Sequence, residues 1–299
     1  MIRYFPIFTL FVCLLVACGG GSSGDGSGRS GADNEGLGEA GSEELSFSAP
    51  QANQIRPGAL VTADGSQCTS NFLFYLNDET VYLGVAAHCF SPDTNSGVDP
   101  CEARSLPVGF NEIQVENASR PAELVYSSWV AMQEVGESPG SAACEFNDFA
   151  LVRLAGEDIA NIHPAVREVG GPTALESNLA GPGDPVVLFG RSDFTLGNRE
   201  LQVREGQVVE VLGGGWAYDI VADGSVSPGD SGGPVLTGDG RALAVVSTFT
   251  LVLGSGSLAG PVRAGVVNLD RALDYAKEQG FIHADVRLLT WSAFSPPAL

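Results

Sequence analysis

The chain has 299 residues and a formal net charge of −21, from 15 Lys and Arg against 36 Asp and Glu. Hydrophobic residues make up 44% of it, which is enough for a packed core. At about 150 residues per domain, this length fits two domains or one large all-β domain. The acidic balance argues against nucleic acid, whose phosphates are bound by Lys and Arg, and against adhesion to an anionic lipid surface.

The first 17 residues have the pattern of an export signal. One positive charge, Arg3, precedes an apolar run at residues 7–17 (IFTLFVCLLVA). A membrane span needs about 20 apolar residues, so this run fits a signal peptide better than a transmembrane helix. The run ends in Leu-Val-Ala before Cys18, which resembles the lipobox of bacterial lipoproteins.

This resemblance implies cleavage before Cys18 and transfer of a diacylglyceryl group to its thiol. The protein would then be exported and lipid-anchored in the cell envelope. Gly19, rather than Asp, after the cysteine favours the outer membrane of a Gram-negative cell. The alternative is an ordinary signal peptide with an incidental cysteine.

Residues 18–51 are predicted to form a flexible tether. Residues 19–45 are dominated by Gly, Ser and acidic residues and lack apolar periodicity, so they cannot bury a core. A flexible chain of this length reaches roughly 30 Å. The folded domain is therefore expected at residues 52–299.

The cysteine content indicates two disulfides in that domain. Of six cysteines, one lies in the signal and Cys18 is the expected lipid site. An exported protein meets an oxidising compartment, and four cysteines allow three pairings that spacing alone cannot distinguish. A zinc site is the competing interpretation, but no C-x-x-C pair is present and we expect no metal. The four cysteines are Cys68, Cys89, Cys101 and Cys144.

The folded part contains short apolar runs separated by Gly, Pro, Asp and Asn, which predict many short strands and a barrel or sandwich. Residues 156–184 are poorer in strand signals and are interpreted as the crossing between two halves. One helix is expected at residues 270–280, with an acid at its start and Gly280 at its end. The predicted strands are residues 59–62, 72–76, 81–86, 124–132, 149–154, 185–189, 202–212, 217–221, 234–237, 242–250 and 261–269.

Three short motifs carry the chemistry: VAAHC at residues 85–89, NDFALV at 147–152 and GDSGGP at 229–234. A serine hydroxyl is a poor nucleophile until an imidazole takes its proton and a carboxylate orients that imidazole. Each motif alone has an ordinary structural interpretation, as a core histidine, a capping aspartate or a hairpin turn. A catalytic triad would be excluded only if all three motifs had these ordinary roles at once.

The motifs and their order resemble those of chymotrypsin-like serine proteases, over about residues 55–281. The resemblance implies two six-stranded antiparallel β-barrels, at about 55–155 and 180–270, followed by the C-terminal helix. It makes His88 the general base, Asp148 its orienting partner and Ser231 the nucleophile. The backbone N–H groups of Gly229 and Ser231 would form the oxyanion hole.

The resemblance also bears on the cysteines, because in this family the cysteine after the histidine pairs with one in the preceding hairpin. That implies Cys68–Cys89 and leaves Cys101–Cys144. The Gly-x-Ser-x-Gly elbow of α/β-hydrolases is an alternative for the third motif. It requires the order Ser, acid, His, and no alternation of strands and helices precedes Ser231.

The sequence departs from the digestive relatives at the activation site. No Ile-Val-Gly-Gly start is present, and the matching region is residues 55–58 (IRPG). A buried Asp230 still needs a partner, because an unpaired buried charge is costly. The secreted bacterial branch, similar to α-lytic protease, uses an arginine in a Gly-Arg turn. Arg191 follows Gly190, and we therefore predict an Arg191–Asp230 ion pair.

The resemblance also places the residues that recognise substrate. Ser225 would lie at the base of the specificity pocket, Val226 and Val246 in its walls, and Ser247 in the strand that pairs with the substrate. Phe249 would shorten the pocket. Cleavage after small or medium apolar residues is therefore expected, and the nearby Asp223 leaves a preference for Lys or Arg as the alternative if the loop is shifted.

The sequence thus predicts an exported, lipid-anchored serine endopeptidase. It is expected to be monomeric, to act on peptides or proteins, and to use no cofactor. Two alternatives stay open: a binding lipoprotein that keeps the fold without turnover, and an esterase that uses the same triad.

Overall fold

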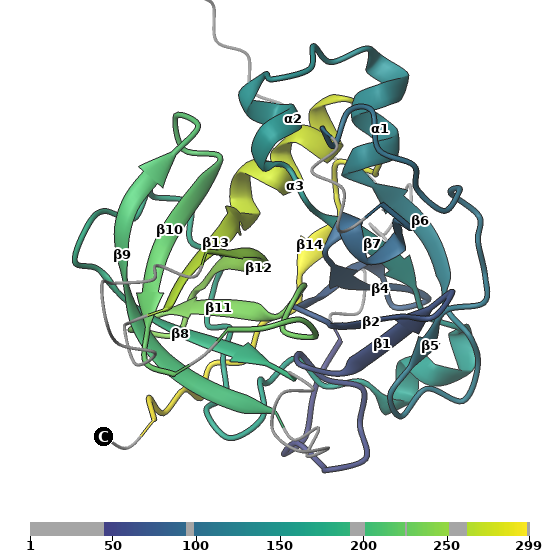
Figure 1. The fold of residues 1–299 in the computed structure, drawn as a ribbon. Coiled ribbons are helices and arrows are strands. Elements are labelled where there is room, and N and C mark those ends of the chain that lie inside the picture. The colour runs from purple at the N-terminus through teal and green to yellow at the C-terminus, as the bar shows by residue number, and fades with distance from the viewer. Residues whose placement is uncertain (1–44, 94–98, 192–200, 225, 251–261, 298–299) are drawn as a thin grey trace, which may run out of the picture. The chain divides into compact units, whose positions relative to one another are not determined.

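The computed structural model describes residues 45–93, 99–191, 201–224, 226–250 and 262–297. The predicted signal, Cys18 and most of the predicted tether lie outside these residues. The described part is mostly β, with two open sheets in its first half, a closed barrel in its second half and a helix near its C-terminus (Figure 1).

The first half contains a three-stranded sheet, in the order β2-β1-β5, and a five-stranded sheet, in the order β14-β3-β4-β7-β6. The strands of the smaller sheet are β1 (Leu60–Ala63), β2 (Ser66–Thr69) and β5 (Gln114–Val115). Those of the larger sheet are β3 (Leu73–Asn77), β4 (Thr80–Val85), β6 (Glu123–Ser127), β7 (Ala150–Arg153) and β14 (Arg287–Leu288).

The second half closes into a barrel of six strands, in the order β10-β13-β12-β11-β8-β9. Its inward side chains, among them Leu188, Tyr218, Ile220 and Val235, are at most 1% exposed and form one core cluster. The strands are β8 (Pro185–Gly190), β9 (Gln202–Leu212), β10 (Ala217–Ala222), β11 (Pro234–Thr237), β12 (Ala242–Thr250) and β13 (Val262–Asn268).

The expectation of two six-stranded barrels is therefore correct for the second half only. In the first half β5 has two residues, and a single isolated bridge, Ile113↔Ala122, joins the stretch before β5 to the stretch before β6. Residues 107–121, which include β5, contain two prolines, one glycine and two asparagines. These residue types do not favour a longer strand with regular pairing. The first half consequently consists of two open sheets.

The apolar run at residues 124–132 is not the single strand that we expected. Strand β6 ends at Ser127, and α1 (Ser128–Val135) begins at the next residue. Ala, Met, Gln and Glu favour helix in this stretch, and Gly136 ends it with φ of 73°. A second short helix, α2 (Ala142–Phe146), precedes the NDFALV motif.

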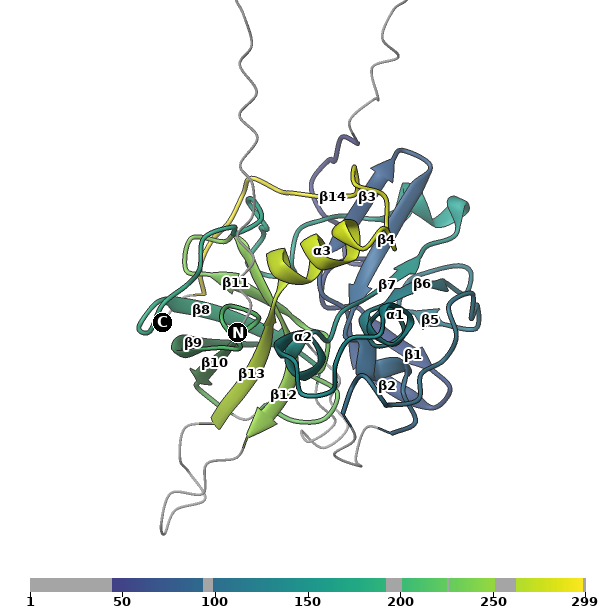
Figure 2. The same cartoon turned by 90° about the horizontal axis from the view of Figure 1, so that it is seen from above.

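Helix α3 (Leu269–Glu278) matches the expected C-terminal helix, and the side chain of Asn268 accepts a hydrogen bond from the N–H of Arg271 at its start. It contacts α1 of the first half and β12 and β13 of the second (Figure 2). After α3 the chain returns to the first half, where β14 pairs with β3. Within the described residues, no helix combines the length and apolar character that crossing a membrane would require.

Candidate active site

His88 and Asp148 meet because their strands are neighbours. Strands β4 and β7 pair antiparallel, with Val85 opposite Ala150. His88 lies just after the end of β4, in the 3₁₀-helix η1 (Ala87–Phe90), and Asp148 lies just before β7. Both residues therefore lie at the same end of the paired strands. His88 Nδ1 lies 2.6 Å from Asp148 Oδ2.

The Asp148 carboxylate is almost fully buried and accepts three hydrogen bonds. The backbone N–H of His88 donates to Oδ1 at 2.8 Å. His88 Nδ1 and the hydroxyl of Ser247 both approach Oδ2. These contacts fix the carboxylate and assign the Nδ1 proton of a neutral His88 to the Asp148 side, which leaves Nε2 as the basic nitrogen.

The two groups also shift each other's pKa. Burial favours the uncharged imidazole, but the Asp148 charge and its hydrogen bond outweigh this and raise the pKa of His88 above 6.5. Burial likewise opposes ionisation of Asp148, and His88, together with hydrogen bonds, lowers the pKa of Asp148 below 3.8. A raised imidazole pKa suits a group that must accept a proton during a reaction.

Backbone contacts on two sides hold the loop that carries Ser231. The carbonyl of Ser231 accepts a hydrogen bond from the N–H of Thr69 at 2.8 Å. Gly232 donates to the carbonyl of Val246 at 2.7 Å, and the N–H of Val246 donates to Gly233 at 2.9 Å. Gly232 has φ of 85°, and a Cβ there would lie 2.3 Å from the carbonyl oxygen of Thr69, so glycine is required.

These contacts bring Ser231 to the His88–Asp148 pair by two routes. On one side, Thr69 follows Cys68, which is bonded to Cys89, the residue after His88. On the other side, Val246 precedes Ser247, whose hydroxyl donates to Asp148. In the described part of the chain, the Ser231 hydroxyl makes no hydrogen bond to His88, and such bonds commonly tighten only when substrate is bound.

The backbone N–H groups of Gly229 and Ser231 have no hydrogen-bond acceptor among the described residues. The carbonyl of Gly229 accepts from the Thr69 hydroxyl at 2.6 Å, which fixes the orientation of the peptide that follows Gly229. The N–H groups of Gly229 and Ser231 are therefore two donors left free by the described residues next to the Ser231 hydroxyl, and they form a candidate site for a ligand oxygen.

Asp230 pairs with Arg204, so the predicted Arg191–Asp230 ion pair is wrong. Arg204 Nη2 lies 3.1 Å from Asp230 Oδ2, and both side chains are at most 5% exposed. The N–H of Ser227 also donates to Oδ2, at 2.9 Å. Burial raises the pKa of Asp230, and the charge of Arg204 opposes that rise.

The alternation of side chains along β8 explains why Arg191 does not reach Asp230 and Arg204 takes its place. Asp230 Oδ1 would lie only 2.2 Å from a Cβ on Gly190, so the Gly190 face of the chain is turned toward Asp230. Successive residues of an extended chain face opposite sides, so Arg191 points away. Its Nε donates to the carbonyl of Gly58 at 2.7 Å, and its Nη2 lies 2.8 Å from Glu116.

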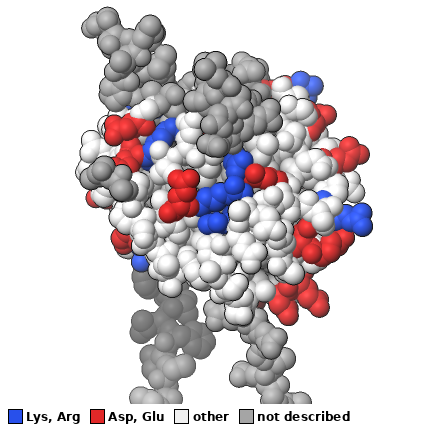
Figure 3. All heavy atoms as spheres, turned by 90° about the horizontal axis from the view of Figure 1, so that it is seen from below, with Lys and Arg blue, Asp and Glu red and all other residues white. Residues whose placement is uncertain are grey.

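Glu116 also lies 3.5 Å from a second arginine, Arg167. Figure 3 shows one face of the molecule on which basic side chains gather near the centre and acidic side chains lie beside them. The buried Arg191 side chain therefore binds the Gly58 carbonyl and Glu116 rather than Asp230.

The expected specificity residues are only partly described. Ser225 and the side chain of Phe249 lie outside the described part of the chain. Val226 and Val246 are at most 4% exposed and belong to the core of the second half. Ser247, expected in the substrate-pairing strand, lies in β12 and also donates to Asp148, a role that the sequence analysis missed.

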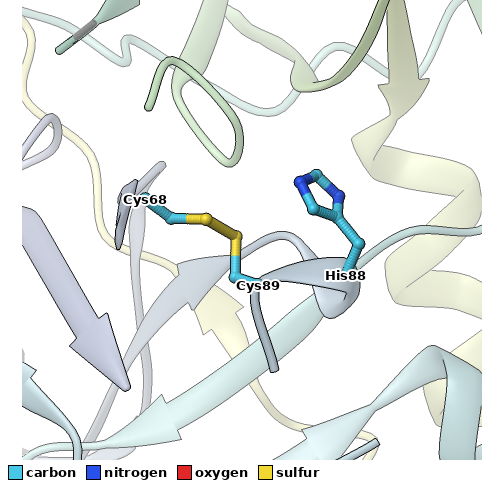
Figure 4. Close-up of side chains that lie close together, drawn as sticks. All are labelled: Cys68, His88 and Cys89. Carbon is cyan, nitrogen blue, oxygen red and sulfur yellow. A yellow bond between two sulfur atoms is a disulfide. The ribbon is translucent and has the colours of Figure 1, made fainter. Parts of the chain in front are cut away.

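Both cysteine pairs implied by the resemblance, Cys68–Cys89 and Cys101–Cys144, are disulfides in the structure. The first lies next to His88, and Figure 4 shows the disulfide and the imidazole leaving η1 in different directions. The three side chains are close enough to suggest a metal site, but the two sulfurs are bonded to each other and offer no thiolate.

The sequence analysis also missed the polar residues at the end of β2 and before β3. Thr69, Ser70 and Asn71 are completely buried. Thr69 holds the carbonyls of Gly229 and Ser231, and Asn71 Nδ2 donates to the carbonyl of Gly232 at 3.2 Å. The available signal was a polar triplet directly before the apolar run at residues 72–76, with a cysteine directly before the triplet.

A sequence-family model described as a trypsin-like peptidase domain matches residues 74–245, which include all three motifs. That match spans more than half of the chain. The protein therefore belongs to the trypsin-like peptidases, and it is a serine peptidase, a hydrolase.

A comparison with curated proteins found no match. Among solved structures, a glutamic-acid-specific serine protease is 18% identical, with 79% of this chain and 100% of that chain covered and a TM-score of 0.44. A serine endoprotease from Yersinia pestis is 12% identical, with 78% and 68% covered and a TM-score of 0.43. A thermostable serine protease, AL20, from an extremophilic microorganism is 18% identical, with 73% and 92% covered and a TM-score of 0.43.

Proposed function

We propose that this chain is an exported, lipid-anchored endopeptidase that cleaves peptide bonds through His88, Asp148 and Ser231. The observation that carries the proposal is the His88–Asp148 pair, 2.6 Å apart with its carboxylate buried, beside a glycine-rich loop that holds Ser231. A hydroxyl, an imidazole and a carboxylate in this order are the components of acyl transfer by a serine nucleophile.

In the proposed mechanism, His88 Nε2 takes the proton of the Ser231 hydroxyl as its oxygen attacks the scissile carbonyl carbon. Asp148 holds Nδ1 and stabilises the imidazolium that forms, without itself taking the proton. His88 then gives the proton to the leaving amine, and an acyl ester remains on Ser231. Water, deprotonated by the same imidazole, hydrolyses this ester and restores the hydroxyl.

The oxyanion of the tetrahedral intermediate would be held by the backbone N–H groups of Gly229 and Ser231. Their lack of an acceptor among the described residues supports this role, because donors that are free to bind the developing charge need not first break another hydrogen bond. The hydrogen bond from Thr69 to the carbonyl of Gly229 would keep the loop in this arrangement.

Labelling with a fluorophosphonate tests the proposed triad, since this reagent reacts preferentially with an activated serine. We expect the protein, expressed in membranes, to be labelled without any proteolytic cleavage beyond removal of its signal. Ser231→Ala should abolish labelling by removing the nucleophile, and His88→Ala should reduce it to background by removing the base. Circular dichroism checks that each variant is folded.

Labelling that survives Ser231→Ala would refute the assignment of the nucleophile. A folded wild type that is not labelled would favour the alternative of a protein that binds without turnover. A labelled protein that hydrolyses ester substrates but no peptide in a library would favour the esterase.

We infer a preference for small or medium apolar residues on the acyl side of the cleaved bond. The support is the residue types at the expected pocket positions, with Ser225 in place of an acid at its base and valines at 226 and 246. None of these three residues offers a counter-charge to a Lys or Arg side chain, whose burial without one is costly.

The proposed lipid anchor rests on the 15–18 sequence LVAC and the Gly-rich segment after it. Cys18→Ser removes the thiol that would carry the diacylglyceryl group. We expect this variant to leave the membrane fraction of a bacterial host, whereas Cys13→Ser, within the signal, should not change fractionation. Equal membrane retention of wild type and Cys18→Ser would exclude the anchor. We expect the processed domain to be monomeric and to face its peptide substrates outside the cytoplasm.

A further inference from the structure

The first residue of α1, Ser128, is completely buried and hydrogen-bonds to both neighbours of Asp148. Its hydroxyl donates to the carbonyl of Asn147 at 2.8 Å. The same oxygen accepts the N–H of Phe149 at 3.0 Å. One hydroxyl thus uses its donor and an acceptor position on the two residues that flank Asp148.

The two contacted groups belong to the peptide units on either side of the Asp148 Cα. The Asn147 carbonyl is part of the unit before it, and the Phe149 N–H is part of the unit after it. The two remaining backbone rotations of Asp148, φ and ψ, change the relative orientation of these units. A single oxygen bonded to both therefore restrains both rotations.

A third contact ties this bridge to the sheet. The backbone N–H of Ser128 donates to the carbonyl of Phe149 at 2.9 Å, directly after the β6–β7 pairing of Ser127 with Ala150. Ser128 is thereby held against the strand that Asp148 precedes. The position of the Asp148 side chain is set by His88 and Ser247, and that of its backbone by Ser128.

We infer that Ser128 is a positioning residue, which fixes the backbone of Asp148 so that its carboxylate meets His88. This role rests on the proposed function, because it matters for turnover only if Asp148 orients the base. Ser128 itself touches no reacting atom.

The neighbouring residue provides a matched control. Ser127 is 1% exposed, and its hydroxyl has no hydrogen-bond partner among the described residues. Ser127→Ala and Ser128→Ala therefore remove the same atom from equally buried sites one residue apart. Only the second removes a contact to the Asp148 segment.

The experiment measures kcat and KM on a peptide substrate and follows the pKa of His88 by NMR in the full-length protein. For Ser128→Ala we expect kcat to fall about 10- to 100-fold with KM unchanged, the size of effect that a small misplacement of a catalytic group produces. The pKa of His88 should fall as Asp148 moves away from it. Ser127→Ala should leave both quantities unchanged, and Ser128→Thr, which keeps the hydroxyl, should retain most of the activity.

Wild-type kcat and an unchanged pKa of His88 in folded Ser128→Ala would overturn the inference, even if that variant is less stable. If Ser128→Ala does not fold, Ser128→Cys replaces it, because a thiol of similar shape is a much weaker hydrogen-bond partner. Wild-type kcat in Ser128→Cys would then overturn the inference. A wild type without any turnover contradicts the proposed function instead, and the pKa of His88 in the two alanine variants still tests the restraint on Asp148.

Discussion

Asp148→Asn is expected to lower kcat for peptide hydrolysis about 10⁴-fold near neutral pH. The carboxylate accepts hydrogen bonds from the backbone N–H and Nδ1 of His88 and from the hydroxyl of Ser247. An amide has only one acceptor oxygen, so its NH₂ group would face one of these donors. The imidazole would then either turn away or place its proton on Nε2, where it cannot accept one from Ser231.

The same substitution should change the dependence on pH. The pKa of His88 is raised above 6.5 by Asp148, so the acid limb of the wild-type kcat/KM profile should have its midpoint above that value. Asparagine removes the charge, and the midpoint should move to lower pH. An unchanged midpoint would mean that Asp148 does not interact with the base that the profile reports.

Stability should respond in a defined pH window. The raised pKa of His88 contributes stability below 6.5 that is lost as pH rises through its folded-state value. The lowered pKa of Asp148 contributes stability above 3.8 that is lost as pH falls through its folded-state value. The wild type should therefore exceed Asp148→Asn in unfolding free energy most clearly between 3.8 and 6.5.

Asp158→Asn is the matched control for these measurements. Asp158 is 2% exposed and accepts the backbone N–H groups of Ser119, at 2.7 Å, and Arg120, at 3.2 Å. It is thus a buried, hydrogen-bonded carboxylate that does not contact His88. We expect its replacement to lower stability while kcat and the acid limb stay as in the wild type. An equal loss of kcat in both variants would show a general effect of removing a buried carboxylate.

Local patterns predicted the strands near the site because each strand is continuous in sequence. Strands β9, β11 and β12 have the predicted bounds, and β4 and β7 differ from prediction by one residue at each end. The three motifs pointed to His88, Asp148 and Ser231, and of these the structure places His88 in contact with Asp148. The Cys68–Cys89 pairing followed from the resemblance alone, since four cysteines allow three pairings.

The features that the sequence did not predict depend on contacts between distant segments. Nothing near Thr69 indicates that its backbone and hydroxyl hold Gly229 and Ser231, about 160 positions later. The change from strand to helix occurs at Ser127 and Ser128, inside the otherwise apolar run at residues 124–132, where periodicity does not distinguish strand from helix. The bridge from Ser128 to the neighbours of Asp148 could not be predicted for the same reason.

The choice between two arginines illustrates this limit most clearly. Sequence proximity to a Gly-Arg turn favoured Arg191 as the partner of Asp230, and both arginines are buried. Which side chain reaches Asp230 depends on the pleat of β8 and on its register with β9, where Arg204 lies opposite Leu188. Register is a property of the assembled sheet, so neither sequence segment alone predicts which arginine reaches Asp230.

Arg204→Met is consequently expected to lower the free energy of unfolding by about 3–5 kcal/mol, the usual cost of leaving one member of a buried ion pair alone. Arg204 and Asp230 are 5% and 1% exposed, so water cannot replace the lost partner. Urea denaturation at neutral pH measures the loss. The double variant with Asp230→Asn should recover much of it, because no unpaired charge then remains buried.

The pH dependence of this loss distinguishes an unpaired charge from a packing defect. The pKa of Asp230 is already raised above 3.8 by burial, and removing Arg204 should raise it further. A raised carboxyl pKa contributes stability below 3.8 that is lost as pH rises through the folded-state value, so the difference between variant and wild type should shrink in acid. Arg191→Met is the control, since it removes a buried arginine that contacts Gly58 and Glu116. If Arg191→Met instead shows the loss that shrinks in acid and Arg204→Met does not, Asp230 pairs with Arg191 in solution.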